Sequence, residues 1–160
     1  QEITEAAGLP AYEVSNHACP GGACRHNLLY WQGGDYLGIG PGAHGRLGDG
    51  ATRALRQFRI PERWLRMVEA QGHGTEEITP LTPAERVEEL LLMGLRLTEG
   101  VGRERFRAQT GLALEQAVAQ ENAKQLIQDG LIEWTPTHLR ATGRGRPVLN
   151  ALIALLTPEV

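Results

Sequence analysis

The sequence predicts an α/β protein with a glycine-rich, strand-like first part and a mainly helical C-terminal domain. Two observations indicate this fold class. The opening "QEITEAAGLPAYEVS" has the pattern of a helix that runs into a strand, which is half of a βαβ unit. From Pro80 onward, the order helix, helix, helix, hairpin, helix is winged-helix-like. We therefore divide the chain into residues 1–50, a connecting helical segment 51–79 and a winged-helix-like domain 80–160.

Composition excludes several classes of protein. The chain has 160 residues, of which 41% are hydrophobic and 22% charged, as in globular proteins that bury a core. A net charge of −3 gives no reason to expect nucleic acid or an anionic membrane surface as a partner. No apolar run approaches the roughly 18 residues of a membrane span. Two cysteines do not make a disulfide framework, so we expect a cytoplasmic, reducing setting.

The first zone begins with a short helix. Apolar residues recur at helical spacing, and Gly8 followed by Pro10 is a typical stop. Residues 11–15 then alternate like a strand, and "DYLGIG" predicts a second strand before a glycine-rich turn. Because the helix lacks the strand that would precede it in a βαβ unit, we expect a C-terminal piece of a larger α/β protein.

The second zone contains a helix and a cluster of arginines. The segment "IPERWLRMVEAQG" predicts a helix with Pro61 in its first turn and Gly72 just after its end. The arginines form either a solvated helix face or a carboxylate-binding cluster, because a guanidinium matches a carboxylate in shape. They are Arg53, Arg56, Arg59, Arg63 and Arg66.

The third zone carries clear helix signals. Thr82, Pro83 and Glu85 have the pattern of a capping box with proline at the first helical position. A short helix is expected around residues 102–109 and a longer one over 114–129, each followed by glycine. The segment "LIEWTPTHLRA" predicts a hairpin that turns at residues 135–137, and "RPVLNALIALL" predicts a final amphipathic helix.

A winged-helix-like order raises the question of DNA binding. A recognition helix normally carries basic residues that neutralise phosphates. The candidate helix over residues 114–129 offers Lys124 against three acidic side chains, and only the wing, with Arg140, Arg144 and Arg146, is basic. We therefore favour a packing domain and expect no nucleic-acid partner.

Cysteine and histidine lie close together near residue 24, which raises the question of a metal. Structural zinc takes four ligands in tight pairs. Cys19 and Cys24 form a loose pair with His26, and the fourth ligand would be His17 or His44. An iron–sulfur cluster needs three or four thiolates, and this chain has two cysteines. We therefore expect neither site to be held by this chain alone.

Two further features have both a structural and a functional interpretation. The turn "YLGIGPGAHG" follows a predicted strand. Its glycines either let the backbone approach a nucleotide closely or simply make a bend. The turn lacks the G-x-G-x-x-G pattern of dinucleotide-binding proteins. His26 lies beside Tyr30 and Trp31. A histidine in this setting is either hydrogen-bonded within the fold or an axial ligand of haem iron, with aromatic rings against the porphyrin.

The stretch "YEVSNHACPGGACRHNLLYWQGGDYLGIGPGAHG" closely resembles a segment of the radical S-adenosylmethionine (radical SAM) family of oxygen-independent coproporphyrinogen III oxidase-like proteins. Its "HNLLYW" element, His26–Trp31, is similar to the mark of the haem chaperone (HemW-type) branch of this family. The segments "LTEGV", "GLIE" and "VLNALIALL" resemble the family's C-terminal domain. His17 and Gly45 depart from the family, which often has Phe and Ser there.

The resemblance implies a fold and a set of cofactors. Residues 1–50 would supply the last strands of a partial (β/α) radical SAM barrel, followed by the winged-helix-like domain. The cofactors would be S-adenosyl-L-methionine, a 4Fe-4S cluster with ligands outside this chain, and haem. Because the family's C-x3-C-x2-C motif is absent here, we expect this chain alone to be inactive. The residues implied on the S-adenosylmethionine side are Gly40, Gly42, Ala43 and His44, and those implied for haem are His26, as iron ligand, with Tyr30 and Trp31.

The resemblance implies a haem chaperone that delivers haem to acceptor proteins. The alternative is the oxidase itself, an oxygen-independent coproporphyrinogen III dehydrogenase that acts by a radical in porphyrin biosynthesis. The implied partners are haem-accepting proteins and the upstream part of the same full-length chain. Within this picture the arginine cluster around Arg53–Arg66 would either pair with haem propionates or remain a solvated face.

Overall fold

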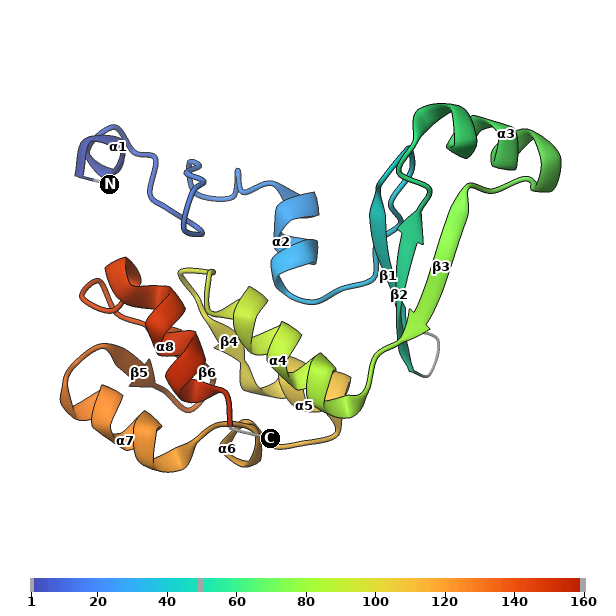
Figure 1. The fold of residues 1–160 in the computed structure, drawn as a ribbon. Helices are drawn as coiled ribbons and strands as arrows, with labels where there is room; N and C mark the ends of the chain where they lie inside the picture. Colours follow the sequence, from blue (N-terminus) through green and yellow to red (C-terminus); the bar gives the residue numbers. More distant parts are fainter. Residues whose placement is uncertain (1, 49–50, 159–160) are drawn as a thin grey trace. The chain divides into compact units, whose positions relative to one another are not determined.

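The computed structural model describes residues 2–48 and 51–158 of the chain. Within them the fold is α/β, with helices and two antiparallel sheets of three strands each (Figure 1). The chain divides into two compact units. The first comprises Gln1–Gly33 with Val87–Val160, and the second comprises Gly34–Arg86. The chain returns from the second unit to the first within helix α4 (Pro83–Gly94).

The sheet of the first unit is built around the predicted hairpin. Strands β5 (Ile132–Trp134) and β6 (His138–Ala141) pair antiparallel, and the short β4 (Val101–Gly102) pairs with the other edge of β6. Thr135 stabilises the turn, because its backbone amide donates to the carbonyl oxygen of His138 at 2.8 Å. The predicted hairpin and its turn are therefore confirmed.

Helices pack around this sheet and close the core of the first unit (Figure 1). The predicted caps are present: Thr82 and Glu85 form the capping box of α4, with Thr82 N–H to Glu85 Oε2 at 2.8 Å. Each such cap stabilises a helix by about 1 kcal/mol. Phe106 and Leu91 are fully buried at the centre of the core. The other helices of this region are α5 (Arg103–Thr110), α6 (Leu114–Ala117), α7 (Gln120–Gln128), the 3₁₀ turn η1 (Arg146–Val148) and α8 (Leu149–Leu156).

The single helix expected over residues 114–129 is wrong, because the structure has two helices there. The chain leaves the helical conformation at Val118, where φ is −117° and ψ is 153°. The next amide, of Ala119, donates to the carbonyl oxygen of Leu156 at 2.9 Å. A tertiary contact with the end of α8 therefore takes the place of the helical hydrogen bond that local propensity favours.

The N-terminal part of the first unit contains two short helices, α1 (Glu2–Ala6) and α2 (Arg25–Trp31). The predicted strand over residues 11–15 is absent, since Ala11 and Glu13 form only isolated bridges, to His17 and Leu97. The Glu13 side chain is almost fully buried, and its carboxylate accepts hydrogen bonds from Ser15 N–H at 2.9 Å and Asn16 Nδ2 at 2.6 Å.

The second unit contains a sheet that the sequence did not predict. Strands β1 (His44–Gly48), β2 (Thr52–Gln57) and β3 (Thr75–Pro80) lie in sequence order and are antiparallel. The predicted strand "DYLGIG" contributes only the bridge from Tyr36 to Arg46. Helix α3 (Pro61–Gln71) forms as expected and ends at Gly72, whose φ is 81°.

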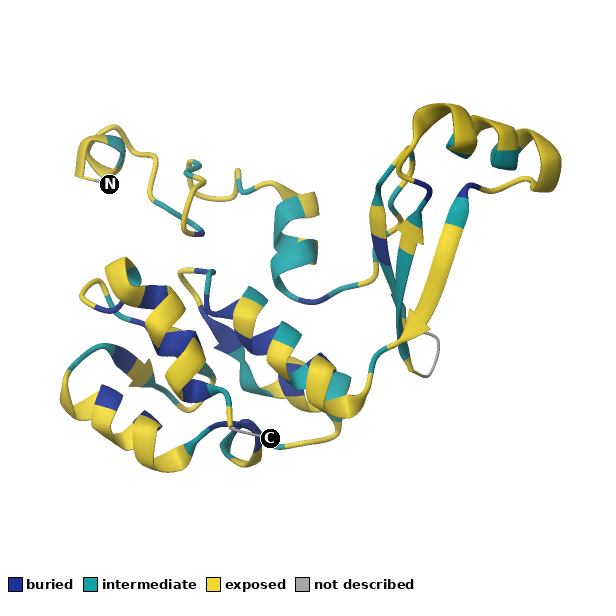
Figure 2. Ribbon diagram, viewed as in Figure 1, coloured by how far each residue is buried: buried dark blue, intermediate teal, exposed yellow. Residues whose placement is uncertain are grey.

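Burial differs between the two units. Figure 2 shows buried residues concentrated in the C-terminal part of the first unit, whereas the second unit is mostly half-buried or exposed. In the second unit Trp64 packs over Gly74 and donates its indole N–H to Gln57 Oε1 at 3.1 Å. Within the described part of the chain, no helix combines the length and apolar character needed to cross a bilayer.

Candidate functional site

The "HNLLYW" element forms helix α2, a feature that the sequence analysis did not predict. The helix has seven residues and no side-chain cap at Cys24, so it lacks the usual start signal. His26 is exposed, and Tyr30 follows four residues later on the same helix face. Among the described residues, no hydrogen-bond partner engages the His26 imidazole. In its neutral form an exposed imidazole has one ring nitrogen with a free lone pair, which is suited to ligate a metal or haem iron.

Trp31 points to a different side of α2. It lies five residues after His26, so the two side chains point in directions about 140° apart around the helix axis. Its ring meets that of Tyr30 edge to face, with centroids 4.9 Å apart and planes at 70°. The guanidinium of Arg96 lies 5.2 Å from the Trp31 ring centroid, in cation–π geometry. The structure therefore joins Tyr30 to Trp31 and directs Trp31 toward the C-terminal part of the first unit.

Hydrogen bonds hold the chain on both sides of α2. Before the helix, Thr98 donates its amide to the carbonyl oxygen of Tyr12 at 3.0 Å and its hydroxyl to that of Ala11 at 2.9 Å. After the helix, Gln109 Nε2 donates to the carbonyl oxygen of Gly33 at 2.8 Å. The C-terminal domain thus positions the helix that carries His26.

Arg146 strengthens the first of these anchors. It donates from Nη2 to the Thr98 hydroxyl at 2.6 Å. Burial lowers the pKa of the Arg146 guanidinium, while the charges of Glu13 and Glu5 act in the opposite direction. An arginine stays protonated at neutral pH, so the interaction with these carboxylates persists there.

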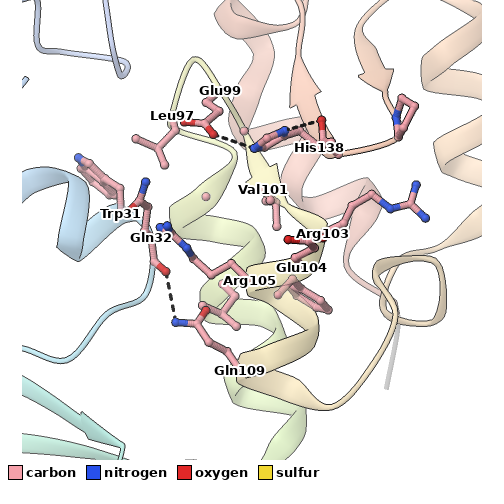
Figure 3. A pocket seen from close by; sticks show the side chains of 17 residues that line it. Trp31, Gln32, Leu97, Glu99, Val101, Arg103, Glu104, Arg105, Gln109 and His138 are labelled. Atoms are coloured by element: carbon pink, nitrogen blue, oxygen red, sulfur yellow. Dashed lines mark hydrogen bonds and ion pairs between the residues drawn. The ribbon is translucent and has the colours of Figure 1, made fainter. Parts of the chain in front are cut away.

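A cavity of about 310 Å³ lies in the first unit between α2 and the C-terminal domain (Figure 3). Its lining comes from four places in the sequence: the end of α2, α4 with the loop after it, α5, and the hairpin turn. Trp31 contributes from the end of α2, Gln32 from the position just after it, and His138 from the hairpin. The spacing of residues along the chain does not indicate that these distant segments pack together, so the cavity could not be predicted from the sequence.

Most polar groups around the cavity have partners. His138 Nε2 lies 2.8 Å from Glu99 Oε1, and the other ring nitrogen lies 2.9 Å from the Thr137 hydroxyl. Arg103 forms an ion pair with Glu115. These contacts fix the hairpin turn and the start of α5, and they give the cavity polar walls.

The glycine-rich turn lies in the second unit, and the backbone there explains why these positions are occupied by glycine. A Cβ at Gly38 would collide with the backbone of His44. Gly40 and Gly42 have φ values of 112° and 71°, which favour glycine. The amide of Gly42 donates to the carbonyl oxygen of Phe58 at 2.9 Å. Much of this turn is therefore explained by the fold alone.

Two positions in the turn remain accessible. A Cβ built at Gly40 would meet nothing within 4 Å, so a ligand can approach the backbone there. His44 is exposed at the start of β1, and it lines a shallow hollow of about 160 Å³ with Arg46 and Arg56. The residues implied for S-adenosylmethionine thus belong to the second unit, and those implied for haem belong to the first.

The remaining sequence candidates are dispersed. Cys19 and Cys24 are exposed free thiols, and the described residues contain no group of three or more side chains that would hold a metal ion. In the arginine cluster, Arg56 lies 2.8 Å from Glu77, and Arg63 stacks 4.3 Å from the Phe58 ring centroid. These two arginines are therefore engaged within their own unit.

Comparison with known proteins defines the class of the C-terminal part. Residues 81–148 match the HemN C-terminal domain family. The fold is similar to that of the radical SAM enzyme coproporphyrinogen III oxidase (HemN) from Escherichia coli, with a TM-score of 0.64 and 16% identity over 96% of this chain and 38% of that one. At this identity the similarity shows the fold alone.

Sequence relatives specify the family further. The chain is 38% identical over 96% of its length to the mitochondrial radical S-adenosyl methionine domain-containing protein 1 of Bos taurus. It is 34% identical over 94% of its length to heme chaperone HemW of Mycobacterium tuberculosis, and 32% identical over 99% to that of Escherichia coli. The chain spans only 36–40% of the length of these relatives. It belongs to the HemN-like family of radical SAM proteins, as a C-terminal portion.

Proposed function

We propose that this chain is the C-terminal part of a radical SAM haem chaperone, which binds S-adenosylmethionine and haem and delivers haem to acceptor proteins. Similarity over nearly the whole chain to proteins named heme chaperone HemW supports this function. Residues 1–50 would complete a partial (β/α) barrel, 51–79 would connect, and 80–160 would form a winged-helix-like domain. The protein would act in the cytoplasm, which cell fractionation tests.

The structural observation that carries the proposal is the exposed imidazole of His26. It stands on α2 without a partner among the described residues, with Tyr30 on the same face. These residues fit a haem: the imidazole would hold the iron and the phenol ring would pack on the porphyrin. Haem would be the cargo and would bring the iron, while this chain would supply the ligand and hold its helix in place.

The glycine-rich turn fits the adenosyl side of S-adenosylmethionine at two positions. The open backbone at Gly40 and the exposed His44 allow contact with a ligand, whereas the amide of Gly42 is already bonded. The 4Fe-4S cluster would be held by residues outside this chain. The contribution of this unit would therefore be to bind and orient the cofactor, through Gly40, Gly42, Ala43 and His44.

The test uses the full-length protein that contains this chain. Haem is titrated into the wild type and the His26→Ala variant, and the Soret absorption band is followed. We expect the wild type to give a saturable Soret shift and the variant to bind at least about tenfold more weakly, because the iron loses its ligand. His73→Ala, which removes another exposed histidine in the second unit, is the matched control and should bind as the wild type does. Equal binding by His26→Ala and the wild type would exclude His26 as the ligand.

A second measurement separates chaperone from oxidase. Loaded protein is mixed with a haem-free acceptor protein, and transfer is followed by the change in the Soret band. Product analysis with coproporphyrinogen III runs in parallel. Transfer without decarboxylation supports the chaperone, whereas turnover of coproporphyrinogen III would assign the oxidase activity instead.

A further inference from the structure

The cavity beside Trp31 has no role in the function proposed above. Its volume of about 310 Å³ lies at the lower end of the roughly 300–1,000 Å³ typical of small-molecule sites. It therefore accommodates a small ligand, or one arm of a large one. Its floor is apolar, since the lining side chains of Leu90, Leu97, Val101 and Phe106 are at most 5% exposed.

The charged side chains that line the cavity differ in whether they have an ion-pair partner. Arg103 is bound to Glu115, and the His138 imidazole is bound to Glu99. Arg105 has no acceptor among the described residues. Figure 3 shows its side chain extending from α5 toward Trp31 and Gln32. A guanidinium without an acceptor among the described residues, next to an apolar floor and an indole ring, favours a ligand with an anionic, planar group.

We propose that this cavity is a carboxylate site, which takes an apolar arm ending in a carboxylate and holds that carboxylate on Arg105. The apolar floor receives the body of the arm, and the guanidinium forms a bidentate pair with its end. A propionate arm of a porphyrin and a small free acid share this chemistry. The porphyrin source rests on the proposed function, whereas the cavity itself does not require His26.

The first experiment uses a small probe and its neutral counterpart. 3-Phenylpropionate and 3-phenylpropionamide are titrated into the full-length protein, and binding is followed by ligand-observed NMR. Because a hydrogen-bonded charge pair contributes about 1.5–3 kcal/mol, the acid should bind about tenfold or more tightly than the amide. Arg105→Gln should abolish this preference. Arg107→Gln, an exposed arginine on the same helix that does not line the cavity, should keep it.

Glu104 provides a control of opposite sign. It is exposed, lines the same cavity and neighbours Arg105 on α5. Removing its negative charge in Glu104→Gln should leave binding of the acid unchanged or tighten it. Weaker binding of 3-phenylpropionate by this variant would argue against an anion site.

The second experiment identifies the source of the arm. Metal-free protoporphyrin IX and its dimethyl ester are compared by fluorescence, so that iron ligation by His26 plays no part. A preference for the diacid that Arg105→Gln removes assigns the site to a porphyrin propionate. An acid preference confined to 3-phenylpropionate assigns it to a small free acid. No acid preference with either probe, or one that survives Arg105→Gln, overturns the proposal, whatever haem titration of His26→Ala shows.

Discussion

The side-chain amide of Gln109 donates a hydrogen bond to the backbone carbonyl oxygen of Gly33 at 2.8 Å and so connects helix α5 to the residues just after α2. It also reaches the carbonyl oxygen of Gln32, at 3.4 Å. Residues 76 positions apart in the sequence are thereby joined next to the cavity. The family motif and the C-terminal domain therefore form one structural unit.

Replacing Gln109 by Ala should loosen α2 without unfolding the domain. A neutral hydrogen bond contributes about 0.5–1.5 kcal/mol, so amide exchange over residues 28–33 should accelerate about 2- to 10-fold. Hydrogen–deuterium exchange with mass spectrometry measures this change. Gln125→Ala is the control, because the exposed side chain of Gln125 donates to Asp129 Oδ1 at 3.0 Å, at the end of its own helix. Unchanged exchange in Gln109→Ala would mean that other contacts fix α2.

Replacing Phe106 by Ala should destabilise the first unit strongly. Phe106 is 1% exposed in the main core, and truncation of a buried phenylalanine costs about 3–5 kcal/mol. Urea unfolding gives the free-energy difference. Leu92 on α4 is 43% exposed, and Leu92→Ala should change the stability by less than about 1 kcal/mol. Similar costs for the two variants would contradict the assigned core.

Gly100→Ala should be more destabilising than Gly111→Ala. Both glycines have positive φ, 86° and 75°, and alanine pays about 1–2 kcal/mol for that conformation. At Gly100 the added Cβ would also collide with the carbonyl oxygen of Leu139, whereas at Gly111 it would meet nothing within 4 Å. The clash should add about 1–3 kcal/mol, which thermal unfolding of the two variants would reveal.

The capping box should make the stability of α4 depend on pH. Hydrogen bonds from the Thr82 backbone and hydroxyl lower the pKa of the Glu85 carboxyl below its ordinary 4.5. A lowered folded-state pKa stabilises the fold above pH 4.5, and this contribution is lost as the pH falls through the folded value. Glu85→Gln should therefore flatten the stability profile below about pH 4.5.

Urea midpoints measured from pH 6 to pH 3 test this expectation. Glu88→Gln is the control, because Glu88 is exposed on the same helix and is not one of the two residues of the capping box, Thr82 and Glu85. If Glu85→Gln and Glu88→Gln change the profile equally, the capping box does not cause the dependence.

Capping residues and glycines in the sequence correctly predicted helix ends that depend only on neighbouring residues. The capping box at Thr82 and the left-handed glycines Gly72 and Gly111 mark three helix ends correctly. The break at Val118 was missed, because Ala119 bonds to Leu156 far along the chain. Strand β2, rich in arginine, has no apolar alternation, and its sheet is only half-buried.

The candidate site was predicted only as a motif. Resemblance identified His26, Tyr30 and Trp31, but the sequence did not show that Trp31 turns away from His26 toward Arg96. Arg105 and Gln109 carry no motif of their own. Their place beside the cavity follows from tertiary packing of α5 against the end of α2.

The bonds that hold α2 have a consequence for biosynthesis. Thr98 and Gln109, which secure the chain before and after this helix, are translated long after it, and the bond from Thr98 to Ala11 spans 87 positions. Loops of that length close late and at an entropic cost. During synthesis on the ribosome we therefore expect this helix to stay unanchored until Thr98 and Gln109 have emerged, and the His26 imidazole to take its place only then.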